Sequence, residues 1–241
     1  MFTKITLENF RSFDHIELDL TEKGNTAKHL AILYGENGAG KSNLMSAFVL
    51  LPELTRTMDA RAAYERILAQ GAIFQDENME KEMREHIRQR LRDMSAIIKD
   101  YQMADCENPI VAEYEFNIDG NNGCYRVEFG QDEILHERLE FVLNRRRGLY
   151  FDCSATGINI NDSIIEKEQG KEFLADVKEM AKRYWGKHSL LAILIYEMKD
   201  KSNSFGRDNI TKNFNAVLSE FRNLSCTVSM GDKSWEGLHA Q

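Results

Sequence analysis

The chain opens with alternating hydrophobic and polar positions. Residues 3–8 and 15–20 each alternate in this way, which predicts two short β-strands. The segment between them, residues 9–13 (NFRSF), is predicted to be a turn, and the polar residues 21–28 a hairpin loop. The run 29–34 (HLAILY) is almost continuously apolar, and such a run is typical of a strand buried on both faces.

Longer segments with helical periodicity follow. Residues 43–51 (NLMSAFVLL) predict a strongly apolar helix that ends near Pro52. From residue 59 to residue 101 the pattern is helical and highly charged, with Gly71 as the predicted break. The mixed charges of residues 77–99 indicate a helical insertion that faces solvent.

A second group of strand patterns occupies the middle of the chain. Residues 110–118 and 125–129 alternate, and residues 119–123 between them are rich in glycine and asparagine, which predicts a β-hairpin. Residues 134–144 and 148–153 are predicted to add further strands.

The last part of the chain is predicted to be helical. Residues 164–199 have helical periodicity with a break at Gly186, and residues 190–196 are expected to be a core segment. A final helix is predicted over residues 209–221, followed by an irregular tail.

The composition is that of a soluble globular protein. Of its 241 residues 42% are hydrophobic, and only two are proline. No apolar run approaches the roughly 18 residues that a membrane span requires, and the N-terminus has no apolar stretch long enough for a signal peptide. We therefore expect a cytoplasmic protein with no membrane partner. The cysteines have no paired spacing for a zinc site, which favours free thiols at Cys106, Cys124, Cys153 and Cys226.

The net charge limits how the chain can contact nucleic acid. At a formal charge of −8, binding of DNA phosphates over the whole surface is excluded, so any DNA contact needs a local patch. Arg145, Arg146 and Arg147 form the densest basic cluster. They are candidates for such a patch or for contact with a partner, and a solvated surface run is the favoured alternative.

One motif points directly to chemistry. The sequence GENGAGKS fits the pattern GxxxxGK[ST] at Gly35, Gly40, Lys41 and Ser42. In such a loop the glycines let backbone N–H groups point inward toward phosphate oxygens, and the following helix adds its N-terminal N–H groups and the positive end of its dipole. The lysine reaches the β and γ phosphates. An apolar strand pattern before the loop and an apolar helix after it make a chance glycine turn the weaker alternative.

This loop predicts that the chain binds a nucleoside triphosphate, ATP with Mg²⁺, and that the Ser42 hydroxyl is a Mg²⁺ ligand. A GTPase would need a base-reading motif such as NKxD, and none is present in the sequence. The residues expected to bind ATP are Gly35, Glu36, Asn37, Gly38, Ala39, Gly40, Lys41, Ser42 and Asn43.

The wider segment resembles a known family. The layout ITLENFRSF, an alternating strand and then AILYGENGAGKSNLMSAF is similar to the N-terminal ATPase half of the RecF, SMC and OLD-nuclease group, whose loop commonly reads GxNGxGKSxLLxA. Residues 134–139 resemble the IxxExL step of AAA-type, OLD-like ATPases of bacterial defence and repair loci. The resemblance implies an α/β fold, namely a P-loop NTPase lobe of the ABC-ATPase type with a mixed or antiparallel β section and a helical insertion.

The predicted organisation has four segments. Residues 1–58 hold the N-terminal strands, the phosphate loop and the first helix, and residues 59–104 are the helical insertion. Residues 105–162 form the antiparallel β section, and residues 163–241 form a helical subdomain. The resemblance implies that this subdomain continues into a C-terminal half that the sequence does not contain.

The resemblance also places the turn with Arg11 and Ser12 beside the nucleotide. Arg11 is thus a candidate phosphate contact, with a plain surface arginine as an equal alternative. Phe10 or Phe13 could pack near the base, although an aromatic side chain between strands more often belongs to the core.

Three parts of ABC-type catalysis have no clear match. These are the signature stretch, a Walker B strand that ends in Asp-Glu, and a histidine that senses the γ phosphate. Residues 217–220 (VLSE) start like a signature but lack its glycines, and residues 192–197 (AILIYE) lack the aspartate and lie in a helical pattern. No catalytic residue is therefore assigned. Alone, the chain is expected to bind nucleotide and to hydrolyse it poorly or not at all.

Three hypotheses follow. The leading one is the ATP-binding portion of an ABC-type ATPase, in which two heads of a homo-oligomer sandwich ATP and hydrolysis gates DNA processing, repair or anti-phage defence. The alternative is a non-catalytic nucleotide-binding regulatory module that acts with a partner effector protein. The third, a small phosphotransferase, would need an acceptor pocket with a catalytic carboxylate beside the γ phosphate, and no motif indicates one.

Overall fold

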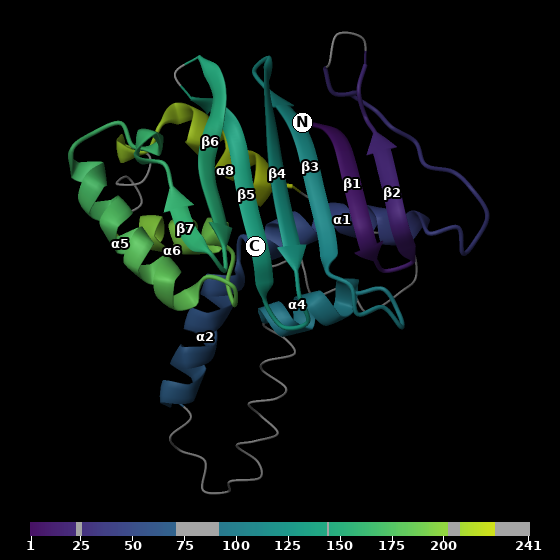
Figure 1. The fold of residues 1–241 in the computed structure, drawn as a ribbon, viewed down its shortest axis with the longest axis horizontal. Helices are drawn as coiled ribbons and strands as arrows, with labels where there is room; N and C mark the ends of the chain where they lie inside the picture. Colours follow the sequence, from purple (N-terminus) through teal and green to yellow (C-terminus); the bar gives the residue numbers. More distant parts are fainter. Residues whose placement is uncertain (23–25, 71–91, 144, 202–207, 225–241) are drawn as a thin grey trace, which may run out of the picture.

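A computed structural model of the chain describes residues 1–22, 26–70, 92–143, 145–201 and 208–224. Its seven described strands form one sheet in the order β2-β1-β3-β4-β5-β6-β7, and each neighbouring pair is antiparallel (Figure 1). The expected β section is therefore antiparallel in its described strands, and it also takes in the two N-terminal strands. The strands are β1 (Phe2–Phe10), β2 (Phe13–Asp19), β3 (Ile110–Ile118), β4 (Asn121–Phe129), β5 (Ile134–Leu143), β6 (Arg146–Ser154) and β7 (Gly157–Ile160).

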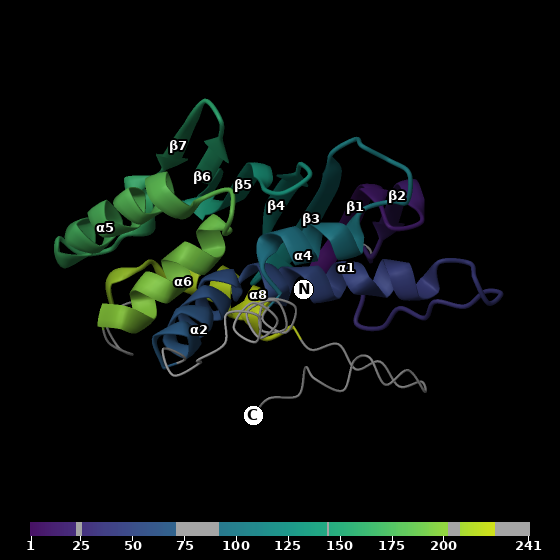
Figure 2. The same cartoon turned by 90° about the horizontal axis from the view of Figure 1, so that it is seen from below.

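The described helices gather on one side of this sheet, as the view from below shows (Figure 2). None of them is long and apolar enough to cross a membrane. The α/β class is confirmed, in the form of a sheet with a layer of helices. The helices are α1 (Lys41–Leu54), α2 (Thr57–Gln70), α4 (Met94–Tyr101), α5 (Gln169–Tyr184), α6 (Leu190–Lys201) and α8 (Lys212–Arg222), with a short 3₁₀ helix η1 (Asp162–Ile164).

Period-two alternation explains the first two strands. In β1 the side chains of Ile5 and Leu7 are fully buried, while the alternating Thr6 and Glu8 are partly exposed. The predicted turn narrows to two residues, since Phe10 pairs with Phe13 across the β1–β2 hairpin. Because β1 also pairs with β3, the N-terminal hairpin and the middle strands share one sheet.

The β3–β4 hairpin is confirmed, but its turn is shorter than predicted. Ile118 pairs with Asn121, so the turn consists of Asp119 and Gly120, both with positive φ. Such a pair suits the right-handed twist of the flanking strands. The following glycine, Gly123, belongs to β4, where a Cβ atom would lie 2.3 Å from the ring of Phe116. The glycine-rich stretch therefore serves ring packing as well as the turn.

The helix boundaries depart from the sequence pattern in two places and agree with it in a third. Helix α1 continues through Pro52 to Leu54 rather than ending before the proline. The predicted helix from residue 164 begins only at Gln169, after the 3₁₀ turn η1. The break at Gly186 is confirmed, since α5 ends at Tyr184 and Gly186 has a φ of 95°.

The charged insertion is only partly solvent-facing. Residues 71–91, including Gly71, lie outside the described residues. For residues 94–99 the prediction of a solvent-facing helix is wrong, because α4 buries Met94, Ile97 and Ile98. The tertiary contacts of these apolar side chains outweigh the charged residues around them.

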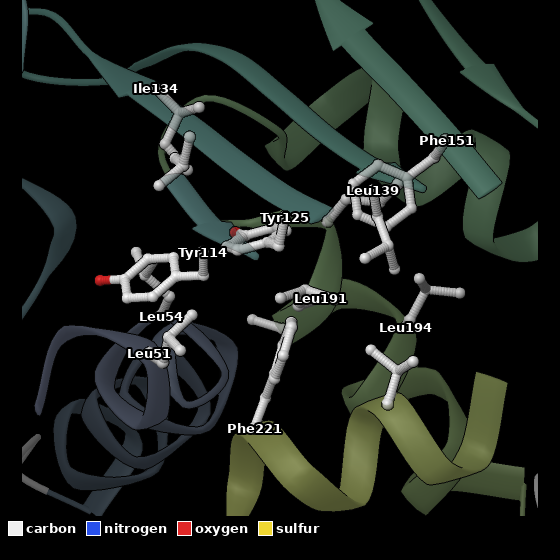
Figure 3. Close-up of a cluster of buried hydrophobic side chains, with 14 of the residues drawn as sticks. Leu51, Leu54, Tyr114, Tyr125, Ile134, Leu139, Phe151, Leu191, Leu194 and Phe221 are labelled. Carbon is white, nitrogen blue, oxygen red and sulfur yellow. The ribbon is translucent and has the colours of Figure 1, made fainter. Parts of the chain in front are cut away.

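The core lies between the sheet and the helices. Leu51 and Leu54 of α1 lie beside Tyr114 and Tyr125 of the sheet, and Phe221 of α8 reaches the same layer (Figure 3). The segment that was predicted to be core, residues 190–196, is buried from Leu190 to Ile195. Burial of this apolar area is the main contribution to folding stability.

The strand predicted over residues 29–34 is absent from the structure. These residues have no strand or helix assignment, and Ile32 and Tyr34 are 74% and 92% exposed. A strand that is apolar on both faces needs neighbours on both sides, and every described strand belongs to the antiparallel sheet elsewhere. The prediction that residues 29–34 form a strand buried on both faces is therefore wrong for the described structure.

Candidate functional site

The predicted phosphate loop leads directly into α1. Gly38 and Gly40 have φ values of 87° and 84°, in the left-handed region where glycine is strongly favoured. Gly40 is the N-cap of α1, no side chain caps this helix start, and no acidic residue lies in its first turn. The first amides of α1 therefore have no side-chain acceptor, and no carboxylate lies in the first turn, which leaves these amides available to an anion.

The Lys41 ammonium group holds the loop together. Its Nζ atom donates to the carbonyl oxygens of Gly35 and Glu36, each at 2.7 Å. The amide of Ala39 donates to the carbonyl of Glu36 at 3.2 Å and closes the turn. The structure thus brings the first and last parts of the motif together around one positive charge. The loop residues 35–39 and Ser42 are exposed.

The β1–β2 turn supports the start of α1. The Asn43 amide group donates to Ser12 Oγ at 2.8 Å. The ring of Phe13 lies so close to Gly40 that a Cβ atom there would be 2.8 Å from it. The predicted proximity of Ser12 to the loop is present in the structure. The role of Phe13 as a support for Gly40 was not predicted, because no spacing pattern links one ring to one distant glycine.

Arg11, the candidate phosphate contact, lies beside Tyr101 at the end of α4. Its φ is 53°, its amide donates to the carbonyl of Tyr101 at 2.8 Å, and its guanidinium carbon lies 5.1 Å from the centre of the Tyr101 ring. Phe10 is fully buried and stacks on the same ring at 5.1 Å, so it belongs to the core. The structure therefore shows Arg11 engaged with α4.

Tyr101 connects this turn to the far end of α1. Its hydroxyl donates to Glu53 Oε2 at 2.9 Å, and Arg92 Nε lies 3.2 Å from Glu53 Oε1. Burial raises the pKa of Glu53, and the nearby Arg92 charge opposes this increase. The helix that begins at the phosphate loop is thus fixed at both ends.

The weaker sequence candidates do not form strands or clusters beside the loop. Residues 192–197, the Walker B candidate, lie within α6 and are not a strand that could present a carboxylate at its end. Residues 217–220, the signature candidate, lie within α8. Arg145 and Arg146 are exposed, and Arg147 donates to Glu140 at 2.8 Å. Burial, with a contribution from the Arg61 charge, lowers the pKa of His188 to about 4.

Glu137, the glutamate of the stretch 134–139, was not assigned a role from the sequence. Its carboxylate is fully buried and accepts hydrogen bonds from the Tyr125 hydroxyl at 3.0 Å, the Trp185 indole N–H at 3.0 Å and the Leu190 amide at 2.7 Å. Burial raises the pKa of this carboxyl to about 7, although these donors favour the charged form. Glu137 therefore joins β4 and β5 to the start of α6, and only the three-dimensional contacts reveal this.

Comparison with known proteins identifies the family of the chain. The family model described as an AAA ATPase domain matches residues 1–224, which include the phosphate loop, the sheet and the helices through α8. No curated protein matches the chain significantly. The match is consistent with the resemblance to the RecF, SMC and OLD-like group. The chain therefore belongs to the AAA ATPase domain family and is an ATP-binding ATPase head of that family.

Proposed function

We propose that this chain is the ATP-binding portion of an ABC-type ATPase of the RecF, SMC and OLD-like group, and that Gly35 to Ser42, with Asn43, bind the nucleotide. The observation that carries the proposal is the Lys41 ammonium group enclosed by the carbonyls of Gly35 and Glu36 at the start of α1. Phosphate oxygens carry full charge and attract an ammonium group more strongly than carbonyl dipoles do. On binding, Lys41 exchanges these carbonyls for the β and γ phosphates of ATP.

The residues present fit a triphosphate with Mg²⁺. The uncapped start of α1 offers amide donors, two positive-φ glycines shape the loop, and the exposed Ser42 offers a hydroxyl oxygen. Mg²⁺ in such sites takes its remaining ligands from phosphate oxygens and water. Bound Mg²⁺ supplies charge neutralisation of the phosphates. Ser12 acts indirectly in this proposal, since it positions Asn43 at the helix start.

The test is isothermal titration of the full chain with Mg-ATP. We expect binding in the wild type and a loss of at least about tenfold in affinity for Lys41→Ala, because a charge-assisted contact contributes about 1.5–3 kcal/mol. Lys171→Ala is the matched control, since the Lys171 side chain is 71% exposed on α5 and its partner is the surface residue Glu168. Absence of ATP binding to the wild-type chain, in a sample with native circular dichroism, contradicts the proposal.

The alternative function is a nucleotide-binding regulatory module without catalysis. Residues 192–197 lie in α6 and not at the end of a strand. Among the described residues no carboxylate is therefore assigned to position the attacking water, and this favours the alternative. Steady-state phosphate release by the purified chain separates the two. Turnover that Lys41→Ala abolishes supports the ATPase, whereas ATP binding without turnover supports the regulatory module or an ATPase that needs further parts.

The biological setting belongs to the same proposal. We infer association of two heads in a homo-oligomer, coupling to DNA processing, repair or anti-phage defence, and action with a partner effector protein, on the basis of the family resemblance. A DNA contact would involve the exposed Arg145 and Arg146 at the start of β6. Replacement of both arginines by serine should then weaken DNA binding and reduce its salt dependence. Unchanged DNA affinity contradicts a role for this patch.

A further inference from the structure

The turn segment (residues 9–13) lies between the phosphate loop and the end of α4. Helix α4 itself lies beside α1, the helix that begins at the loop (Figure 2). On the loop side, the Phe13 ring fills the space beside Gly40, and Ser12 Oγ accepts a hydrogen bond from the Asn43 amide group at 2.8 Å. The turn segment therefore contacts the N-cap of α1 and a residue of its first turn.

The other side of the turn segment is held by the end of α4. The amide of Arg11 donates to the carbonyl oxygen of Tyr101 at 2.8 Å. The amide of Met103 donates to the carbonyl oxygen of Asn9 at 3.2 Å. The ring of Tyr101, which is buried, stacks on Phe10, and the Arg11 guanidinium group lies over it. One residue of α4 thus contacts two consecutive residues of the turn segment.

The backbone of the turn segment is strained, so its conformation depends on these contacts. Asn9 and Arg11 have φ values of 52° and 53°, in the left-handed region that residues with a Cβ atom rarely adopt. Such a conformation costs free energy and persists only where the surrounding structure holds it. Both residues bond through their backbone to the end of α4. Without these contacts the turn segment is free to relax, and its last two residues move with it.

We propose that Tyr101 is a positioning residue for the nucleotide site. By holding the turn segment, it keeps Ser12 and Phe13 against the start of α1, and so keeps the first amides of α1 in the arrangement that phosphate binding requires. This inference rests on the proposed nucleotide site. If release of the turn segment leaves only a fraction of the molecules competent to bind ATP, the apparent affinity falls by that fraction.

The hydroxyl group of Tyr101 has a separate contact, which allows a sharp test. It donates to Glu53 Oε2 at 2.9 Å, at the end of α1 that is far from the loop. Tyr101→Phe removes this bond and retains the ring and the carbonyl group that hold the turn segment. Tyr101→Leu removes the ring as well. A structural role alone predicts that both variants lower stability and that neither changes ATP affinity, whereas positioning predicts a loss of affinity only for leucine.

The first experiment is isothermal titration of the full chain and its variants with Mg-ATP. We expect Tyr101→Leu to bind about fivefold more weakly than the wild type, and Tyr101→Phe to bind with wild-type affinity despite a lower melting temperature. Tyr150→Leu is the matched control, since Tyr150 is a buried tyrosine whose hydroxyl donates to Val142, but it lies in β6. It should melt earlier and bind normally. Unchanged affinity of folded Tyr101→Leu, or an equal loss for Tyr150→Leu, overturns the proposal.

A double-mutant cycle shows whether Tyr101 acts through the turn segment. A variant with both Ser12→Ala and Phe13→Ala lacks the two contacts with the start of α1. If the effect of Tyr101 passes through these contacts, addition of Tyr101→Leu to this variant causes a further loss of less than about twofold in ATP affinity. A larger further loss contradicts this route and overturns the proposal.

Hydrogen exchange of the wild-type chain provides a test that needs no substitution. If separation of the turn segment from α4 abolishes ATP binding, saturating Mg-ATP must make this separation rarer. The amide of Met103 reports on it, since this amide donates to Asn9 and not to the loop. We expect its exchange to slow by at least about threefold with Mg-ATP. Unchanged exchange at saturating Mg-ATP overturns the proposal.

The proposed function and the role of Tyr101 fail in different measurements. If the wild-type chain does not bind Mg-ATP, the proposed function is wrong, and Tyr101 has no nucleotide site to position. If the wild type binds Mg-ATP and Tyr101→Leu binds it equally well, only the role of Tyr101 is wrong and the nucleotide site stands.

Discussion

The sheet and the segment that carries the phosphate loop differ in how they use apolar residues. In the sheet, Ile5 and Tyr114 are fully buried, whereas in the phosphate arm (residues 28–40) Ile32 and Tyr34 are at least 74% exposed. Tyr114 also donates its hydroxyl hydrogen bond to the Ala47 carbonyl of α1, so this buried polar group is satisfied within the fold. The comparison indicates that the sheet and its helices provide the stability of the fold, while the phosphate arm is built to bind.

We expect the largest loss of stability from substitution of Glu137, which is buried between the sheet and the start of α6. Glu137→Ala removes the acceptor of three hydrogen bonds from Tyr125, Trp185 and Leu190. We expect the free energy of unfolding to fall by about 3–5 kcal/mol, because buried donors are left unpaired. Urea unfolding monitored by circular dichroism measures this. Glu179→Ala, at a surface ion pair with Lys182, should change stability by less than about 0.5 kcal/mol. Equal effects would show that Glu137 is not a structural anchor.

A matched pair of isoleucines tests the comparison itself. Ile5→Ala, at a fully buried position of β1, should reduce the free energy of unfolding by about 2–4 kcal/mol, because the deletion leaves a cavity. Ile32→Ala, at a position that is 74% exposed, should change it by less than about 0.5 kcal/mol. The same urea experiment serves both variants. A large loss for Ile32→Ala in the isolated chain would mean that the phosphate arm is part of the folded core.

The free energy of unfolding should depend on pH because of the partly buried His188. Burial first, and then the Arg61 charge, lower its pKa to about 4, below the ordinary value of 6.5. The unfolded chain therefore binds the proton at higher pH, and the stability contributed by neutral His188 is lost as pH falls from about 6.5 toward 4. We expect a loss of about 2 kcal/mol after allowance for its partial exposure to solvent. His188→Gln should lose less stability over this range; identical pH profiles would exclude the effect.

The smallest effect is expected where the two regions meet, at Gly40. Gly38→Ala and Gly40→Ala both place alanine at a φ near 85°, which costs about 1 kcal/mol. Only the Gly40 substitution also meets the Phe13 ring, whereas no atom lies within 4 Å of a Cβ at Gly38. Gly40→Ala should therefore lower the melting temperature by a few degrees more than Gly38→Ala. Calorimetric melting of both variants measures this, and equal melting temperatures would show that Phe13 moves aside freely.

Much of the sheet and its helices could be predicted from local sequence patterns. Alternation located β1 to β6 to within a few residues, since one face of each strand packs on the helices. The four-residue strand β7 was missed, because Gly157 to Ile160 is too short for a periodic signal. Helix α4 was assigned to the solvent because charge counts do not show which face of a helix finds a partner.

The candidate site also has a part that local sequence patterns predict and a part that they do not. The loop from Gly35 to Ser42 is a local motif that the sequence locates directly, and in the structure Gly38 and Gly40 have positive φ and Lys41 contacts loop carbonyls. The contact of Phe13 with Gly40 and the three bonds to Glu137 join residues far apart in the chain, and one sequence contains no signal for them. The buried strand predicted over residues 29–34 is not formed, because an apolar pattern does not show whether neighbouring strands are present, and none lies beside this segment among the described residues.

The central claim is that the amides at the start of α1 bind the phosphates of ATP. Hydrogen exchange of a peptide that spans residues 36–43, followed by mass spectrometry at saturating Mg-ATP, tests it most directly. The account predicts that these amides exchange at least about tenfold more slowly with Mg-ATP than without it, while amides of β4 and β5 are unchanged. Exchange of residues 36–43 that stays the same at saturating Mg-ATP would contradict the claim.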